Sequence, residues 1–253
     1  MVTSRPTLQA RGLSKSFGHV QALVDADLDL YPGEVLAIVG DNGAGKSTLI
    51  KCLSGAHVPD AGQILVDGQP AHIRSPRDAQ ALGIATVYQD LALVDQRDVA
   101  TNLCMGREPV GRFGLVDRKA LLRQADETLA RLNAHIPSVN TPVAVLSGGQ
   151  RQAVAIGRAL AQGGRVIIMD EPAAALGVRE SGQVLELIQG LRVQALGVVV
   201  ISHNLQHVFA IADRIQVMRG GRSVGIRRRQ ETSGEEIVRM ITGADELVAG
   251  AVV

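Results

Sequence analysis

Aromatic side chains make up only 2% of this 253-residue chain, and tryptophan is absent. Hydrophobic residues still account for 46%, so the core must be built from aliphatic side chains, mainly Ala, Val, Leu and Ile. That share suffices for a large core without disulfides or a structural metal. The length fits one large α/β domain, or one domain that carries a sizeable insertion.

The chain also has few cysteines and a net charge close to zero. Cys52 and Cys104 are too few for a disulfide framework, and neither has a metal-ligating neighbour in the sequence. We therefore expect two reduced thiols. The formal net charge of +1 gives no overall attraction to nucleic acid, so we expect no nucleic-acid partner. The one run of like charges, residues 227–229, is expected to be a solvated surface.

Long hydrophobic segments are missing as well. The longest apolar runs have about five residues, whereas a bilayer-spanning helix needs about twenty. The first ten residues have no apolar segment typical of a signal peptide. We expect a soluble chain whose membrane role, if it has one, comes through a partner.

Four short apolar runs are rich in β-branched residues and do not alternate with polar ones. Such runs are typical of strands buried on both faces of a parallel sheet. They are Val35–Val39, Ile84–Val87, Val166–Met169 and Val198–Ile201. Helical patterns lie between them, including residues 118–132, with Asp117 as the N-cap, and residues 178–194. This alternation predicts a three-layer α/β core.

Other parts of the chain follow different patterns. Residues 8–30 predict two strands around a turn at Gly18, and residues 63–71 predict a hairpin that turns at the Asp-Gly pair 67–68. Residues 91–163 contain helices and loops but no convincing strand. We interpret that stretch as a helical insertion.

Polar side chains follow each of the four apolar runs. The carboxyl ends of parallel strands lie along one edge of a sheet, where ligands bind, so side chains that are distant in sequence can converge there. The residues concerned are Lys46, Gln89, Asp170, Glu171 and His203. The sequence therefore predicts one site at this edge.

The first run leads into a phosphate-binding loop of the form GxxxxGK[ST]. Its glycines let backbone N–H groups form an anion-binding nest, and the helix that begins near Lys46 adds its positive dipole end. Lys46 can reach the β- and γ-phosphates, and the Ser47 hydroxyl can hold Mg²⁺. A chance glycine-rich turn is the alternative, but this one follows a buried strand and opens a helix. The predicted loop comprises Gly40, Asp41, Asn42, Gly43, Ala44, Gly45, Lys46, Ser47 and Thr48.

Asp170 ends a strand that we expect to lie beside the phosphate-binding strand. A carboxylate there can orient Mg²⁺, usually through a coordinated water. Glu171 extends one residue further and can polarise the water that attacks the γ-phosphate. Alone, an Asp-Glu pair after an apolar run is a weak signal that is as often structural. Together with loop 40–48, it predicts nucleotide hydrolysis.

A second anion site is predicted at Ser147, Gly148 and Gly149, which precede a helical stretch at residues 151–161. A serine and two glycines at a helix N-terminus offer a hydroxyl, exposed amides and the helix dipole. A flexible loop is the alternative reading of these three residues. Because a second γ-phosphate site is redundant within one domain, this one is expected to serve ATP held by another copy or by a partner.

Taken together, these motifs resemble the nucleotide-binding subunits of ABC transporters along essentially the whole chain. Residues 40–48 (GDNGAGKST) look like Walker A, Gln89 like the Q-loop, residues 146–150 (LSGGQ) like the signature, residues 166–171 (VIIMDE) like Walker B, and His203 like the H-loop. The resemblance implies a P-loop NTPase-type core with an N-terminal antiparallel β subdomain and an inserted helical subdomain. It places one ABC domain over residues 5–248.

Within this family, three segments resemble importers of ribose, xylose, galactose and fructose in particular. Residues 171–181 (EPAAALGVRES), 87–109 and 202–215 look like segments of those proteins. Gly177 stands where most ABC subunits have Asp, and Ala173 stands where Thr or Ser is usual. Such importers often fuse two ATP-binding halves, whereas this chain holds one. The resemblance therefore implies a homodimer.

The resemblance also implies ATP and Mg²⁺ as cofactors and a head-to-tail dimer with ATP between its two copies. Glu171 would orient the water, Lys46 and His203 would stabilise charge on the γ-phosphoryl group, and Gln89 would sense that group. Ser47, Gln89 and Asp170 would surround the metal, the last through water. Ser147, Gly148, Gly149 and Gln150 would contact the partner's ATP. Phe17 would stack on adenine, although an ordinary core Phe remains an alternative.

The partners implied are a second copy of the chain, a membrane permease and, indirectly, a periplasmic sugar-binding protein, at the cytoplasmic face of a bacterial inner membrane. Residues near 91–105 would contact the permease. Two alternatives stay open: an importer ATPase for other solutes such as amino acids, and a soluble ABC ATPase outside transport. The chain lacks the second ATP domain, coiled coil or zinc cysteines usual in the latter.

Overall fold

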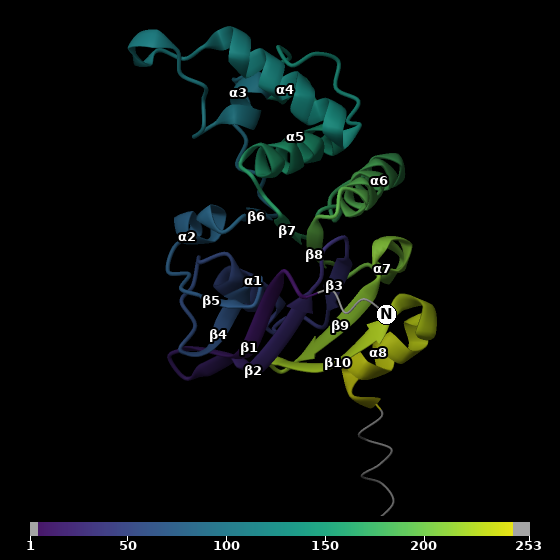
Figure 1. The fold of residues 1–253 in the computed structure, drawn as a ribbon. Helices are drawn as coiled ribbons and strands as arrows, with labels where there is room; N and C mark the ends of the chain where they lie inside the picture. Colours follow the sequence, from purple (N-terminus) through teal and green to yellow (C-terminus); the bar gives the residue numbers. More distant parts are fainter. Residues whose placement is uncertain (1–4, 245–253) are drawn as a thin grey trace, which may run out of the picture.

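The computed structural model of the protein describes residues 5–244, which form two β-sheets and a group of helices at one end (Figure 1). The central sheet has six strands in the order β10-β9-β3-β8-β7-β6. They are β3 (Val35–Val39), β6 (Ile84–Val87), β7 (Val166–Asp170), β8 (Gly197–Ile201), β9 (Arg214–Arg219) and β10 (Arg222–Arg228). All pair in parallel except β10 with β9. The four predicted strands are confirmed to within one residue at each end.

The strand order corrects one expectation. Asp170 does not end a strand beside β3, because β8 lies between β3 and β7: Val198 pairs with Val35 on one side and with Ile167 on the other. The chain leaves β7, crosses over through α6 (Val178–Val193) and returns as β8, next to β3. Strand order is set by such long-range pairings, which a local residue pattern does not encode.

The central sheet is buried on both faces, as its uninterrupted apolar runs predict. Leu36 and Ile38 of β3 pack with α1 (Lys46–Leu53) and the N-terminal sheet. Val35 of the same strand packs in a second cluster with α5 (Gly148–Ala161) and α6. Burying one such aliphatic side chain stabilises the fold by about 1.5–3 kcal/mol. The predicted three layers are thus confirmed. The N-terminal sheet and α1 form the first layer, the central sheet forms the second, and helices including α5 and α6 form the third.

The N-terminal sheet is antiparallel, with the order β2-β1-β4-β5. Its strands are β1 (Leu8–Phe17), β2 (Val20–Leu30), β4 (Ala61–Val66) and β5 (Gln69–Ala71). Asp67 and Gly68 turn the last pair with φ of 49° and 69°, the conformation that a type I′ hairpin turn requires. Both predicted hairpins are confirmed.

Residues 91–163 form a helical subdomain with a small core of its own. It comprises α3 (Val99–Cys104), α4 (Arg118–Leu132), α5, and 3-10 turns at Arg112–Gly114 and Val143–Val145; this fully described range contains no strand. Asp117 caps α4 by accepting a hydrogen bond from the Ala120 amide at 3.0 Å, as predicted. The domain bounds 5–248 stay a prediction, and residues 245–248 lie outside the described part of the chain.

The remaining helices are α2 (Pro76–Ala81), α7 (Leu205–Ile211) and α8 (Gly234–Thr242). Val208 of α7 and Ile237 of α8 pack over β3 and β9. Strand β9 has no counterpart among the predicted strands, because charged residues close both its ends and Gln216 interrupts its apolar run. Within residues 5–244, no helix is long and apolar enough to span a bilayer.

Candidate nucleotide-binding site

Residues 40–45 link β3 to α1 and lie against the rest of the core. Gly40 has a φ of 151°, and a Cβ there would lie 2.2 Å from the carbonyl oxygen of Met218 on β9. Gly45 has a φ of 97°, and a Cβ there would lie 2.6 Å from the carbonyl oxygen of Ala22 on β2. Both positions therefore need glycine for space as well as for conformation. The loop is fixed between the two sheets.

Helix α1 begins at Lys46 with Gly45 as its N-cap, and no described side chain caps it. The amides of its first turn therefore remain available to an anion, at the positive end of the helix dipole. Ser47 is exposed and Thr48 half-buried on the same turn. Asp41, Asn42 and Gly43 are exposed on the loop before it.

Lys46 is only 9% exposed and folds back onto the loop. Its Nζ donates hydrogen bonds to the carbonyl oxygens of Gly40 at 2.7 Å and Asp41 at 2.9 Å. Burial lowers the pKa of Lys46, while the carboxylates of Glu171, Asp41 and Asp170 raise it. The ammonium thus has acceptors that phosphate oxygens can replace.

Asp170 ends β7 and Glu171 follows it, while His203 comes shortly after β8. Burial and the neighbouring Glu171 raise the pKa of Asp170, while Lys51 and Lys46 lower it. Glu171 has a φ of 51°, in the left-handed region that costs about 1–2 kcal/mol for a residue with a Cβ. Its Oε1 lies 2.8 Å from His203 Nδ1. Lys46, Asp170, Glu171 and His203 therefore converge across three strands.

Phe17 and Gln89 are two further predicted site residues, and both are exposed. The Phe17 side chain is 45% exposed and meets His57 edge-to-face at a centroid distance of 5.1 Å, so it is not an ordinary core Phe. Lys15 Nζ lies 5.7 Å from the same ring. Gln89 is exposed directly after β6, while its neighbour Tyr88 shares a hydrogen bond with Ser54 at the end of α1 (3.0 Å).

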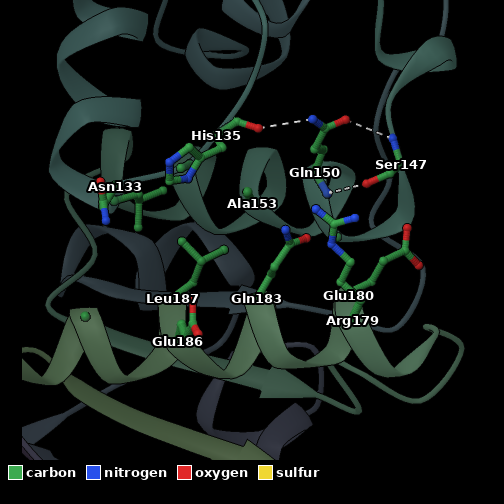
Figure 2. Close-up of a pocket in the computed structure, with 14 residues that line it drawn as sticks. Asn133, His135, Ser147, Gln150, Ala153, Arg179, Glu180, Gln183, Glu186 and Leu187 are labelled. Carbon is green, nitrogen blue, oxygen red and sulfur yellow. Dashed lines mark hydrogen bonds between the residues drawn. The ribbon is translucent and has the colours of Figure 1, made fainter.

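The predicted second anion site lies at the start of α5, on the helical subdomain. The Ser147 hydroxyl accepts a hydrogen bond from the Gln150 amide at 3.3 Å, and Gln150 Oε1 accepts one from the Ser147 amide at 3.0 Å. Gln150 Nε2 also donates to the carbonyl oxygen of His135 at 3.0 Å (Figure 2). A Cβ on Gly148 would lie 2.5 Å from Leu176 Cδ2. The short residue lets the segment after Glu171 approach this helix end.

The structure does not bring the two anion sites together in one copy. Ser147, Gly149 and Gln150 line a groove of about 670 Å³ between α5 and α6, and none of its lining residues comes from loop 40–48 (Figure 2). Glu171 and His203 line a different cavity of about 470 Å³. The signature residues and the pair Glu171 and His203 thus line different cavities.

Comparison with known proteins identifies the family. A family model described as "ABC transporter" matches residues 23–174. The chain belongs to the ABC transporter family. It is 49% identical over 252 residues to the fructose import ATP-binding protein FrcA of Rhizobium meliloti, covering 97% of each chain. It is 43% identical to the xylose/arabinose import ATP-binding protein XylG of Sulfolobus acidocaldarius, covering 93% of each.

Other relatives of this ABC protein are longer. The ribose import ATP-binding protein RbsA 1 of Rubrobacter xylanophilus is 48% identical over 239 residues, which are 94% of this chain but 47% of the relative. Among solved structures, the ADP conformation of the ATP-binding cassette MJ1267 superposes with a TM-score of 0.80 at 25% identity, covering 98% and 99% of the two chains. The predicted family, fold class and ATPase activity are thereby confirmed.

The ABC site contains donors suited to a magnesium ion. The Ser47 hydroxyl and the Asp170 carboxylate are hard oxygen ligands of the kind that Mg²⁺ prefers. Among residues 5–244, no group of three or more His, Cys, Asp or Glu side chains could hold a metal by itself. An ion here would need phosphate oxygens and water to complete its octahedron, as is usual for Mg²⁺ in nucleotide sites.

One residue of this ABC chain that the sequence reasoning missed is Arg158 of α5. Its guanidinium donates hydrogen bonds to the carbonyl oxygens of Leu91 at 2.7 Å and Ala92 at 2.8 Å. Ala92 has a φ of 48°. Burial lowers the pKa of Arg158. The residue thus ties the helix that Ser147 caps to the segment that follows Gln89; an Arg on the Ala-rich stretch of that helix was the available signal.

Proposed function

We propose that this chain is the ATP-hydrolysing motor of an importer for a monosaccharide. The observation that carries the proposal is its similarity to named sugar-import ATP-binding proteins over nearly its full length, at 49% identity for the fructose protein. The conjunction of Lys46, Asp170, Glu171 and His203 supports active hydrolysis over a purely regulatory role. An importer for another solute is the alternative, and no feature of the chain favours it.

Two copies would act head to tail, with each ATP between loop 40–48 of one copy and residues 147–150 of the other. The separation of these segments within one copy supports this arrangement. A solved dimer of the cassette MJ0796, bound to ADP and Pi, shares the fold at 23% identity and a TM-score of 0.72. Residues 41–43 and Ser147 are exposed, which leaves room for a second chain.

For hydrolysis, Glu171 would accept a proton from a water whose oxygen attacks the γ-phosphorus, while the bond from that phosphorus to the β–γ bridging oxygen breaks. ADP and inorganic phosphate are the products. His203 holds one carboxylate oxygen of Glu171, which leaves the other for the water. Lys46 would exchange its two carbonyl acceptors for β- and γ-phosphate oxygens. Positioning and charge stabilisation of this kind are the main requirements of phosphoryl transfer.

Ser47, Gln89 and Asp170 would hold Mg²⁺, the last through water, and the ion when bound would neutralise charge on the β- and γ-phosphates. Phe17 would stack on the adenine, which its half-exposed ring permits. Thr48 and the loop amides would contact the phosphates. Gln89 would couple the γ-phosphate to the helical subdomain.

The chain would sit peripherally at the cytoplasmic face of the bacterial inner membrane, bound to a permease that a periplasmic sugar-binding protein supplies. Within residues 91–105, α3 is mostly buried in its own subdomain. The exposed side chains, including Gln96 and Arg97, precede that helix. This stretch, directly after Gln89, is where the permease would bind.

The test is affinity capture of the tagged chain from gently solubilised membranes, followed by mass spectrometry. We expect a multi-span permease with its sugar-binding protein. Arg97→Glu should lose the permease, whereas Arg123→Glu, an equally drastic change on an exposed part of α4, should retain it. Capture of ribosomes or nucleic-acid enzymes instead would be consistent with the ATPase activity but would contradict the assignment to transport.

A further inference from the structure

An ordered hairpin projects from the outer end of the helical subdomain, between α3 and α4 (Figure 1). We call residues 110–116 the tip hairpin. Val110 and Val116 form an antiparallel bridge, and the Gly111 amide donates to the carbonyl oxygen of Leu115 at 2.8 Å. The Asp117 amide closes the base by donating to the carbonyl oxygen of Pro109 at 2.8 Å. The hairpin is therefore held by its own backbone bonds.

The tip hairpin exposes four large apolar side chains within seven consecutive residues. Phe113 is 94% exposed, Leu115 72%, Val110 67% and Val116 52%. Phe113 also has a φ of 70°, in the left-handed region that bulky residues avoid. Neither local conformation nor packing accounts for an aromatic ring at this place. Clustered exposed apolar residues of this kind mark a contact surface.

Basic side chains surround this apolar tip. Residues 107–119 contain Arg107, Arg112, Arg118 and Lys119 against Glu108 and Asp117, a local net charge of +2 in a chain whose total is +1. Arg118 is paired with Asp98, whereas Arg112 and Lys119 are exposed and have no ion-pair partner among the described residues. The free basic charges thus lie beside the apolar residues.

From this combination we infer that the tip hairpin inserts into an anionic lipid surface. The four side chains are exposed on one short turn and line neither of the two cavities described above, so they suit a soft interface that closes around them. Apolar side chains at the headgroup boundary with guanidinium and ammonium groups at the phosphates are the usual composition of peripheral membrane contacts. The inference goes beyond the proposed function, because it requires neither a permease nor ATP hydrolysis.

The absence of tryptophan makes a direct test possible. Phe113→Trp gives the chain a single indole at the tip, and Val193→Trp gives a matched control at another exposed apolar position, 87% exposed at the end of α6. With vesicles of phosphatidylcholine and phosphatidylglycerol, the emission of Phe113→Trp should shift to the blue and be quenched by brominated acyl chains. The control should show neither change. An unshifted Phe113→Trp emission overturns the inference.

Vesicle flotation tests the same contact without a probe. The parent chain should float with vesicles that contain phosphatidylglycerol and much less with phosphatidylcholine alone. The double variant Phe113→Ser, Leu115→Ser should bind about tenfold more weakly, and Val193→Ser should bind as the parent does. If the double variant floats normally but loses a permease captured in detergent, the tip hairpin contacts protein and not lipid.

Folding controls keep the test decisive. Because Phe113 and Leu115 are exposed, both variants should unfold at the temperature of the parent. If the double variant is destabilised, Arg112→Glu serves in its place, with Arg77→Glu on the distant helix α2 as its control. Weaker binding of Arg112→Glu alone supports the lipid contact, and equal binding of the two overturns it.

Discussion

The phosphate loop and the signature segment are both anion sites at helix N-termini, but they are built in different ways. Loop 40–45 is held between two sheets, with Gly40 and Gly45 in contact with backbone carbonyls of β9 and β2. Residues 147–150 belong to a subdomain with its own core and face an open groove. The first site is confined, because a Cβ at Gly40 or Gly45 would meet the backbone of a neighbouring strand. The second opens α5, whose Ala155 and Ile156 pack against the central sheet, while the hydrogen bonds of Gln150 stay within the helical subdomain.

Glu171→Gln should have the largest effect, since it removes the base from the rigid site while leaving its shape intact. We expect kcat for ATP hydrolysis to fall about 10³-fold, with little change in the equilibrium binding of ATP. Steady-state ATPase assays of the assembled transporter and ATP titration of the isolated chain measure both quantities. Turnover of Glu171→Gln at the parent rate would show that Glu171 is not the general base.

Gly40→Ala tests the rigidity of the phosphate loop. The new Cβ would lie 2.2 Å from the carbonyl oxygen of Met218, so the free energy of unfolding should fall by about 3 kcal/mol. Gly43→Ala is the matched control, because its φ is also positive but nothing lies within 4 Å; it should cost only about 1 kcal/mol. Urea unfolding compares them, and equal losses would show that the loop is not confined by the sheets.

Ser147→Arg tests whether the second site acts across a dimer. ATP hydrolysis should fall about a hundredfold, because the bulky cation fills the place of the partner's γ-phosphate. ATP binding to a single copy should be unchanged, since Ser147 lies apart from loop 40–48. Binding is measured on the dilute chain and hydrolysis on the assembled transporter. Loss of binding to the single copy would place both sites in one pocket.

Arg158→Gln tests the link between α5, which the signature segment opens, and the segment that follows Gln89. Losing two charge-assisted hydrogen bonds to carbonyl oxygens should lower the free energy of unfolding by about 2 kcal/mol. Hydrolysis should weaken more than ATP binding. Arg123→Gln on α4 is the control, because its nearest carboxylate oxygen is 3.9 Å away and the side chain is 75% exposed; it should be neutral. If both variants behave alike, Arg158 does not couple α5 to the segment that follows Gln89.

Asp170→Asn should have the smallest effect on the free energy of unfolding, and that effect is stabilising. Burial and Glu171 raise the pKa of Asp170 above its usual 3.8, so the folded state holds the proton more tightly than the unfolded chain. The ionised carboxylate therefore costs stability above the folded pKa and costs nothing below about pH 4. Asn should gain less than about 1 kcal/mol at pH 7, and the gain should vanish in acid. Urea unfolding at both pH values measures it.

Several strands and one hairpin could be predicted from short residue patterns in the sequence. Uninterrupted β-branched runs identified β3, β6, β7 and β8, and the Asp-Gly pair identified a hairpin. Strand β9 was missed because the buried Gln216, whose amide donates to the carbonyl oxygen of Asp27 at 2.7 Å, reads as a surface residue in the sequence. The position of β8 between β3 and β7 was missed because pairing between distant segments has no local signature.

The same distinction applies to the site. The convergence of Lys46, Asp170 and Glu171 could be predicted because parallel strands end at one edge. That Lys46 rests on Gly40 and Asp41, and that Arg158 holds Leu91 and Ala92, could not, because both depend on which backbone carbonyls happen to lie within reach. Roles for Phe17, Gln89 and the residues of the signature stay predictions.

The left-handed backbone at Glu171 has a consequence for how this sequence can change. At that position glycine satisfies the backbone better than any residue with a Cβ, and a glutamate would be an early loss under selection for folding alone. We therefore infer that selection for function keeps the glutamate, although its left-handed backbone conformation costs free energy of folding. A library sorted only for thermal stability should drift toward Glu171→Gly, whereas one sorted for sugar uptake should keep the acid.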